Sequence, residues 1–306
     1  MIPLLMTLVI VSGDQPKPKS LEGHGALVYN LAFSPDGKVL ATAGFDNVIK
    51  LWDVESNKEI RTLSGHTGPV YSVAFSPDGA TLASSSHDKT IRVWKTADGS
   101  SIREIKGHTD IVDNVRFSPD GKLLVSGSAD KSVRLWNPED GKEVKNLGTH
   151  GGSVYSVAFS PDGKLLASAG VDAIIKIWDV GAQKETKALK GHEGAVTGVV
   201  FGPDNQSLYS IGFDRHVRVW DLGSGKEVRK LGPAPDDLYG IALSSDGKRL
   251  ATSGYGGNVT VWEIADGKSV FTTKLPFGAY CIAFTPDGTA VVTGHDNHHV
   301  YITVVK

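Results

Sequence analysis

The decapeptide VYSVAFSPDG occupies residues 70–79, and the same ten residues return at 154–163. Its first six residues alternate like a β-strand with one buried face. The SPDG that follows is typical of a tight turn, because proline presets φ and glycine tolerates positive φ. The aspartate of this turn could be a catalytic or metal-binding carboxylate, or it could belong to a structural repeat. The spacing along the rest of the chain favours the repeat.

Tryptophans mark a repeat with a period of 42 residues. They stand at Trp52, Trp94, Trp136, Trp178, Trp220 and Trp262. The turn aspartates follow the same interval until one final step of 41, at Asp36, Asp78, Asp120, Asp162, Asp204, Asp246 and Asp287. Each of the seven copies contains four short strand-like runs and no sustained helical period. Such units cannot bury both faces alone, so seven twisted sheets are expected to stack into a closed ring.

Three recurring signatures carry a family resemblance: a Gly-His pair, an aspartate in a second tight turn, and Trp-Asp. With them the chain resembles the WD-repeat β-propeller family from about residue 17 to 305. The resemblance implies an all-β, seven-bladed propeller of four-stranded antiparallel blades, as a single domain over 17–306. Residues 17–22 would complete the last blade and close the ring. The expected blades are 24–64, 66–106, 108–148, 150–190, 192–231, 234–274, and 275–305 with 17–22.

The resemblance also implies a hydrogen-bonded tetrad of His, Ser or Thr, Asp and Trp in each regular blade. Carried over by register, the tetrads are His24, Thr42, Asp46 and Trp52; His66, Ser84, Asp88 and Trp94; His108, Ser126, Asp130 and Trp136; His150, Ser168, Asp172 and Trp178; and His192, Ser210, Asp214 and Trp220. Their composition imitates a catalytic triad, but an active site is normally built once, so five copies indicate a structural role.

Blades six and seven depart from the tetrad pattern. Ala234 and Gly256 occupy the histidine and aspartate positions of blade six, and Asn297 and Thr303 occupy the aspartate and tryptophan positions of blade seven. These blades should be less stable than the others or stabilised by packing of their own. The departure could be drift in terminal repeats or the mark of a docking side, and terminal repeats are commonly atypical.

Composition excludes several classes of function. The net charge of −2 offers no basic field for nucleic acid or an anionic membrane. Cys281 is the only cysteine, which excludes an intramolecular disulfide and a cysteine-based zinc site. No apolar run reaches the roughly 18 residues of a membrane-spanning helix. Residues 1–11 are apolar and resemble a secretory signal without a preceding Lys or Arg, so residues 1–16 are either a signal-like segment or a tail, and the protein is either exported or cytoplasmic.

The chain offers few motifs of enzyme chemistry. The GKS at 267–269 lacks the earlier glycine of a phosphate loop, and no GxSxG, HExxH or CxxC occurs. The one dense cluster of potential metal ligands is HDNHH, with His295, Asp296, His298 and His299. It is placed in the tight turn of the last blade, where a solvated turn is expected and a zinc or nickel site is the alternative. No catalytic residue, metal or cofactor is therefore predicted.

Aromatic residues recur where the first strand of each blade begins. The position four residues before the end of that strand holds Tyr29, Tyr71, Asp113, Tyr155, Thr197, Tyr239 and Tyr280. Just before the tight-turn aspartate position stand Phe45, His87 and Phe213, with Tyr255 in blade six. Tyrosine combines a large contact area with a polar tip and suits interfaces. These residues either form a partner-binding face around the central channel or pack between blades as copied repeat residues.

The sequence therefore predicts a non-catalytic, monomeric scaffold that docks a protein or peptide on this aromatic face. The proposed contacts are Tyr29, Tyr71, Asp113, Tyr155, Tyr239, Tyr280, Phe45, His87, Phe213 and Tyr255. The alternative is a small-ligand or metal binder, or an enzyme, that uses the channel mouth or the turn at His295–His299.

Overall fold

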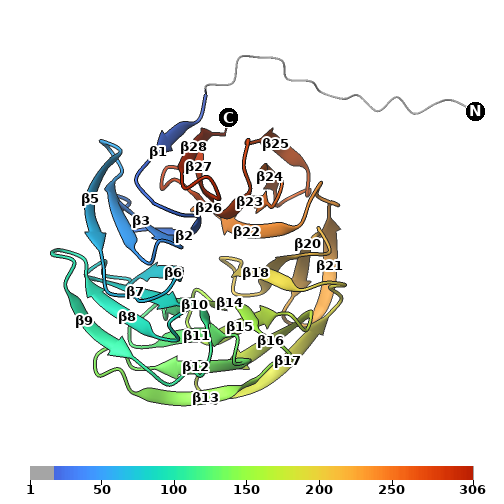
Figure 1. Cartoon of the computed structure of the whole chain (residues 1–306). Helices are drawn as coiled ribbons and strands as arrows, with labels where there is room; N and C mark the ends of the chain where they lie inside the picture. Colours follow the sequence, from blue (N-terminus) through green and yellow to red (C-terminus); the bar gives the residue numbers. More distant parts are fainter. Residues whose placement is uncertain (1–16, 306) are drawn as a thin grey trace, which may run out of the picture.

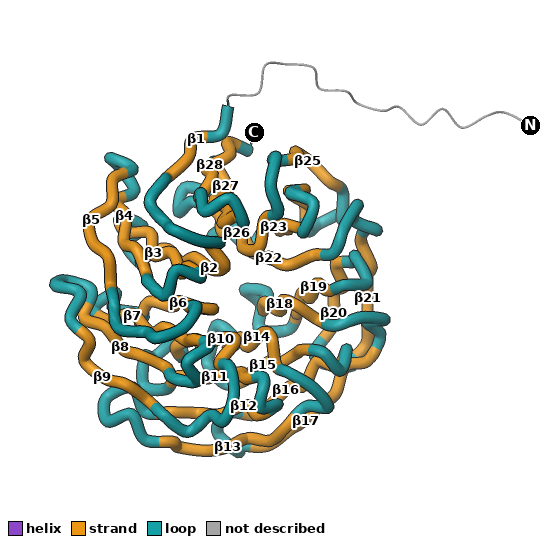
Figure 2. The backbone as a smooth tube through the Cα atoms, viewed as in Figure 1, coloured by secondary structure: helices purple, strands orange, loops and turns teal. Residues whose placement is uncertain are grey.

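The 42-residue period folds into seven four-stranded antiparallel sheets that form a ring, as Figure 1 shows. The structure is a computed structural model that describes residues 17–305, and the predicted tail at 1–16 lies outside this range. Figure 2 shows strands joined by loops, without a helix in the described residues. The predicted fold class is confirmed.

Each blade contributes one strand to each of four concentric positions. The innermost strands are β2 (Val28–Phe33), β6 (Val70–Phe75), β10 (Val112–Phe117), β14 (Val154–Phe159), β18 (Val196–Phe201), β22 (Leu238–Leu243) and β26 (Ala279–Phe284). The second strands are β3 (Val39–Gly44), β7 (Thr81–Ser86), β11 (Leu124–Ser128), β15 (Leu165–Gly170), β19 (Ser207–Gly212), β23 (Arg249–Gly254) and β27 (Ala290–His295).

The outer half of each blade completes the sheet. The third strands are β4 (Ile49–Asp53), β8 (Ile91–Lys95), β12 (Ser132–Trp136), β16 (Ile174–Asp179), β20 (Val217–Asp221), β24 (Asn258–Glu263) and β28 (Val300–Val304). The outermost strands are β5 (Lys58–Leu63), β9 (Ser101–Ile105), β13 (Glu143–Thr149), β17 (Lys184–Lys190), β21 (Lys226–Leu231), β25 (Ser269–Lys274) and β1 (Lys19–Leu21).

The N-terminal strand β1 closes the ring. It pairs antiparallel with β28, with Lys19 opposite Ile302 and Leu21 opposite Val300. The last sheet therefore runs β1-β28-β27-β26 and joins the two ends of the described chain. Each sheet then has two edges, its innermost strand at the channel and its outermost strand at the rim of the ring.

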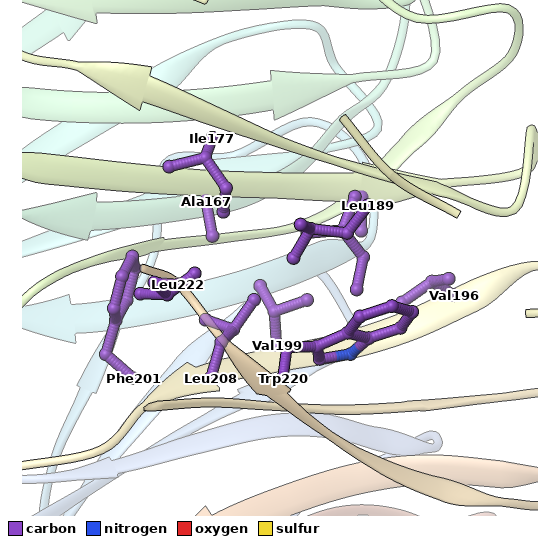
Figure 3. Packing of buried hydrophobic residues seen from close by; sticks show 11 residues of the cluster. Ala167, Ile177, Leu189, Val196, Val199, Phe201, Leu208, Trp220 and Leu222 are labelled. Carbon is purple, nitrogen blue, oxygen red and sulfur yellow. The ribbon is translucent and has the colours of Figure 1, made fainter. Parts of the chain in front are cut away.

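The hydrophobic core lies between blades rather than within them. Figure 3 shows one of the seven clusters, in which Ile177 and Leu189 of blade four pack against Val199 and Trp220 of blade five. The other six clusters join the remaining neighbours in the same way, and the one at the ring closure joins blade seven to blade one. No blade has a core of its own, so the ring is the stable unit.

A hydrogen-bonded tetrad holds each of the first five blades. In blade two, His66 Nδ1 lies 2.8 Å from Asp88 Oδ2, and His66 Nε2 lies 2.7 Å from Ser84 Oγ. The Trp94 indole N–H donates to the same Ser84 hydroxyl at 2.8 Å. A neutral imidazole protonated on Nδ1 satisfies every bond of this chain, because Ser84 can then donate to Nε2.

The equivalent side chains of blades one, three, four and five are joined at 2.7–3.1 Å. Burial opposes ionisation of Asp88, but hydrogen bonds from His66 and Thr90 outweigh it and lower the pKa of this carboxyl. The tetrads thus bring donors to a carboxylate that would otherwise be costly to bury.

Blade six replaces the missing tetrad members with an aspartate from the preceding loop. Ala234 and Gly256 stand at the histidine and aspartate positions, and Asp236 accepts hydrogen bonds from the Gly256 backbone N–H and from Asn258 Nδ2. The Trp262 indole N–H still donates to the second-strand threonine, at 3.3 Å.

Blade seven replaces them with a histidine from its own second strand. His295 Nε2 lies 2.7 Å from Thr293 Oγ1, so an imidazole again meets the second-strand hydroxyl. Thr303 occupies the tryptophan position, and the Tyr301 ring lies edge-on to His295 at 4.8 Å instead. Both atypical blades thus have internal polar contacts of their own.

The repeated Pro-Asp-Gly aspartates bond within their own turns. Asp78 Oδ1 accepts from Ser76 Oγ at 2.5 Å and from the Ala80 N–H at 3.0 Å, and Gly79 adopts a φ of +70°. The corresponding hydroxyl bonds recur at Asp36, Asp120, Asp162, Asp246 and Asp287. These carboxylates therefore stabilise turns, as the sequence indicates.

Candidate docking site

A β-bulge in every blade positions the residues predicted for partner binding. The pairing of the first two strands skips one residue near the start of the inner strand, at Tyr29, Tyr71, Asp113, Tyr155, Thr197, Tyr239 and Tyr280. We call these seven bulge residues the collar. A bulge re-aims a side chain out of the regular alternation of a strand, and it places the collar at one end of the central channel.

The collar surrounds a cavity of about 450 Å³. All seven collar residues line it, together with Phe45, Phe213, Asn30, Asn114, Ile111, Ala129 and Ser153. The tyrosines are partly exposed, whereas Asp113 is 8% exposed. Six of the ten proposed contacts, plus Thr197, thus belong to one register that the fold brings together, and Phe45 and Phe213 line the same cavity from a second register.

Four tyrosines of the collar form a continuous row of rings. The ring centroid of Tyr29 lies 5.1 Å from Tyr71 and 6.0 Å from Tyr280, and Tyr280 lies 5.1 Å from Tyr239. The row spans blades two, one, seven and six. Aromatic rings at these separations attract each other. The row is interrupted at Asp113 and at Thr197, whose hydroxyl donates to the Leu238 carbonyl at 2.7 Å.

The residues before the tight-turn aspartate position extend this row unequally. Phe45 stacks on Tyr29 at 5.3 Å, and Phe213 lies 5.3 Å from Tyr239. Tyr255 lies 6.3 Å from Tyr239 and is 60% exposed, so it stands at the rim. His87 is exposed and does not line the cavity.

The electrostatic field in the cavity is negative. Burial, then the nearby Asp113 carboxylate, raises the pKa of both Tyr71 and Tyr155. Burial, then Asp296, raises the pKa of Tyr280 to about 12. Burial and the charge of Asp110 raise the pKa of Asp113 itself to about 7.

The opposite end of the channel is mostly apolar, although Arg116 also lines it, and this end was not predicted from the sequence. It is a cavity of about 460 Å³ lined by Phe33, Phe75, Phe117, Phe159 and Phe201 and by Pro35, Pro77, Pro119 and Pro161. Their spacing by one period was the available signal. Tyrosine at one end and phenylalanine with proline at the other make the two channel mouths chemically different.

Polar side chains between the two ends bridge neighbouring blades, which the sequence analysis also missed. Asn30 Oδ1 accepts from the Val73 N–H at 3.1 Å, and Asn114 Oδ1 accepts from the Val157 N–H at 3.3 Å. Arg116 donates to Ser72 Oγ at 2.9 Å, and burial lowers the pKa of its guanidinium to about 10. Inner strands of adjacent sheets do not pair, so these side chains supply the hydrogen bonds between them.

The structure does not bring the side chains of the HDNHH segment together as a metal site. His295 is not in the turn: it ends strand β27, is fully buried, and places Nδ1 3.1 Å from the Phe277 carbonyl. His299 instead lies 4.0 Å from Glu22, and His298 has a φ of +72°. Within residues 17–305 no three His, Cys, Asp or Glu side chains are arranged to hold a metal ion. A tight turn sends successive side chains in different directions, which separates the three imidazoles.

Comparison with known proteins agrees with this architecture. A profile described as "WD domain, G-beta repeat" matches residues 16–53, 183–221, 225–263 and 268–302, and one described as "IFT122 first beta-propeller" matches residues 69–187. Seven four-stranded blades with repeated tetrads define a β-propeller. The chain belongs to the WD-repeat family, whose members are generally scaffolds without catalytic activity.

The curated relatives match over single repeats. Ribosome assembly protein 4 of Saccharomyces cerevisiae is 52% identical over 42 residues, which is 14% of this chain and 8% of that protein. The Notchless protein homolog of Arabidopsis thaliana is 54% identical over 39 residues, 13% of this chain and 8% of that protein. WD repeat-containing protein AAC3 of Dictyostelium discoideum is 41% identical over 44 residues, 14% and 9% of the two chains. The aligned parts cover less than a tenth of each relative. Residues 17–305 contain no helix long and apolar enough to cross a membrane.

Proposed function

We propose that the protein is a monomeric, non-catalytic scaffold that docks a protein or peptide partner at the collar end of its channel. The observation that carries this proposal is the row of tyrosine rings around a preformed cavity of about 450 Å³. Aromatic anchors at the centre of an interface commonly dominate binding energy. Because the blades hold the collar rigidly, little ordering entropy is lost on association.

The engagement of the tetrad histidines supports a non-catalytic role. Both ring nitrogens of His66 are hydrogen-bonded within the blade, and the same holds for the histidines of blades one, three, four and five. A general base must be able to reach the proton that it removes from a substrate. These imidazoles are committed to the fold instead.

The relatives support an interaction role without naming a partner. One relative is named for ribosome assembly, but its similarity to this chain covers 42 residues, about one repeat. A single repeat carries scaffold residues shared by many members. The collar, which varies between blades, is the part that would select a partner.

A small-molecule ligand is the second candidate, because the cavity volume lies within the range of ligand pockets, roughly 300–1,000 Å³. A ligand that binds the native state raises the melting temperature. A thermal-shift screen of small molecules, with peptides in parallel, separates the two candidates. The true ligand class should raise the melting temperature of wild type, and Tyr239→Ala should remove that increase.

The docking proposal is tested by selecting peptides from a random library against the intact protein and measuring their Kd. We expect the Tyr239→Ala, Tyr255→Ala double variant to bind selected peptides at least tenfold more weakly. Val228→Ala is the matched control, since Val228 is 62% exposed on outer strand β21. Equal affinity for wild type and the tyrosine variant, or equal loss in the control, would contradict the proposal.

A further inference from the structure

Asp113 is the one acidic residue of the collar and interrupts a ring of tyrosines. It is the bulge residue of β10, the position that holds tyrosine in five other blades. It lines the same cavity as Tyr71 and Tyr155 of the two neighbouring blades, and its charge raises the pKa of both phenols. The carboxylate thus lies in the wall of the docking cavity between two aromatic side chains.

One oxygen of this carboxylate lacks a partner. Asp113 is 8% exposed, and its buried Oδ2 has no hydrogen-bond partner in residues 17–305. It also makes no ion pair with any described residue, whereas Asp130 of the same blade is bonded by His108 and Ser132. Buried polar atoms are nearly always satisfied, so an unsatisfied one needs an explanation.

The surroundings of Asp113 favour a cation. Among the described residues, those that line the cavity include Asp113 and no lysine, arginine or histidine. After burial, the charges of Asp110, Asp237 and Asp296 also act on groups in its wall. The faces of tyrosine rings attract a cation within about 6 Å of the ring centroid. An anion would meet carboxylates of its own sign, and a single carboxylate is a poor site for a metal ion.

Arg116 limits how deeply a cation can enter. Its guanidinium is bonded to Ser72 Oγ and to the Val115 carbonyl. Arg116 lines the middle and the phenylalanine end of the channel rather than the collar cavity. It forms no ion pair with Asp113 in the described chain. Asp113 would attract a positive group that enters from the collar end, and the Arg116 guanidinium deeper in the channel would repel it. The group would therefore stop at the collar.

Resting on the docking function proposed above, we infer that the collar cavity binds a basic side chain, lysine or arginine, of the partner peptide. The ammonium or guanidinium donates to Asp113 Oδ2, and its stem packs against the rings of Tyr71 and Tyr155. The tyrosine row beyond them accommodates the apolar residues that flank the basic one.

The test uses four peptide libraries that differ only in a fixed central residue: arginine, lysine, norleucine or glutamate. Each is panned against the intact protein, against Asp113→Asn and against Glu139→Gln, a control that removes the same charge from an exposed loop of blade three. We expect arginine or lysine peptides to bind wild type at least tenfold more tightly than their norleucine counterparts. Asp113→Asn should abolish this preference, and Glu139→Gln should keep it within twofold.

The outcomes separate this inference from the docking function. Norleucine or glutamate peptides that bind the collar as tightly as basic ones would overturn the inference and leave docking intact. A preference for basic peptides that survives in Asp113→Asn would also overturn it. If no library yields a peptide that wild type retains, both the inference and the docking function fail.

Discussion

Blade three contains two buried carboxylates, one with hydrogen-bond donors around it and one without side-chain donors. They represent two sets of equivalent positions that recur around the molecule, the tetrads and the collar. Asp130 belongs to a tetrad; burial opposes its ionisation, but bonds from His108 and Ser132 outweigh that effect and lower its pKa. Asp113 belongs to the collar, has no such side-chain donors, and has its pKa raised by burial to about 7. The tetrads recur nearly unchanged and stabilise the fold, whereas the collar varies between blades and carries a group that the fold leaves unsatisfied. The tetrad positions, which are nearly the same in each regular blade, thus stabilise the fold. Binding is expected at the collar, whose residues differ between blades.

The largest effect should follow from removing a tetrad tryptophan. Trp136 is fully buried between blades, and Gly107 allows the backbone to pack against it, since a Cβ there would lie 2.8 Å from the indole. Trp136→Ala should lower the free energy of unfolding by about 3–5 kcal/mol. Chemical denaturation measures this loss. A loss below about 1 kcal/mol would show that the tetrads do not make the main contribution to the stability of the fold.

Asp113→Asn should act in the opposite direction. The raised pKa means that ionised Asp113 costs folding stability, and the cost grows as the pH rises from about 4, the unfolded value, to about 7. At pH 8 the variant should be more stable than wild type by about 4 kcal/mol, because a pKa difference of one between the folded and unfolded states corresponds to about 1.4 kcal/mol. The gain should vanish below about pH 4, where both folded and unfolded states hold the proton.

This prediction is checked by denaturation midpoints at pH 4 and pH 8. Glu139→Gln serves as the control because its carboxylate is exposed, and it should show no comparable change. A variant that is no more stable at pH 8 would mean that Asp113 already has an adequate partner within the protein.

The tetrad hydroxyl should have a smaller effect than the tryptophan. Ser84 links His66 to Trp94, so Ser84→Ala leaves two buried polar groups unpaired. The expected cost is roughly 1–3 kcal/mol. Ser224→Ala, in an exposed loop, is the matched control, and the same measurement would contradict the account if both substitutions cost the same.

The smallest effect on stability should come from the rim of the collar. Tyr255 is 60% exposed, so Tyr255→Ala should change the free energy of unfolding by less than about 0.5 kcal/mol. Its affinity for collar-binding peptides should nevertheless fall several-fold, because its ring extends the row at Tyr239. Thermal melting and titration with one selected peptide measure the two quantities. A clear loss of stability without loss of binding would assign Tyr255 to the fold.

The architecture was predictable because the same pattern of strands and turns recurs in seven repeats. A single Trp or Asp-Gly turn says little, but a fixed 42-residue interval predicts seven equivalent four-stranded units. The resemblance to the WD-repeat family then implies ring closure by residues 17–22 and which side chains meet in each tetrad. The register that listed Tyr29 to Tyr280 also held, since equivalent positions in stacked blades lie around one axis.

The exceptions could not be predicted for a physical reason. Asp236 and His295 take over tetrad contacts from positions outside the repeat register, so alignment to the other blades passes over them. The repeat pattern places the HDNHH segment in the turn between the second and third strands, although His295 ends the buried second strand. Whether Asp113 Oδ2 finds a hydrogen-bond partner depends on side chains from three blades. A local sequence pattern cannot predict that such a partner is missing.

The most direct test of the docking site is to map where a bound peptide touches the protein. A peptide selected against wild type, with a photoactivatable group next to its anchor residue, is cross-linked and the modified residues are identified by mass spectrometry. The account predicts cross-links to Tyr71 and Tyr155, which flank Asp113, and to Tyr239 and Tyr280 of the same cavity. It also predicts their loss in the Tyr239→Ala, Tyr255→Ala double variant. Cross-links concentrated on the outer strand at Val228, or at the phenylalanine end of the channel, would contradict it.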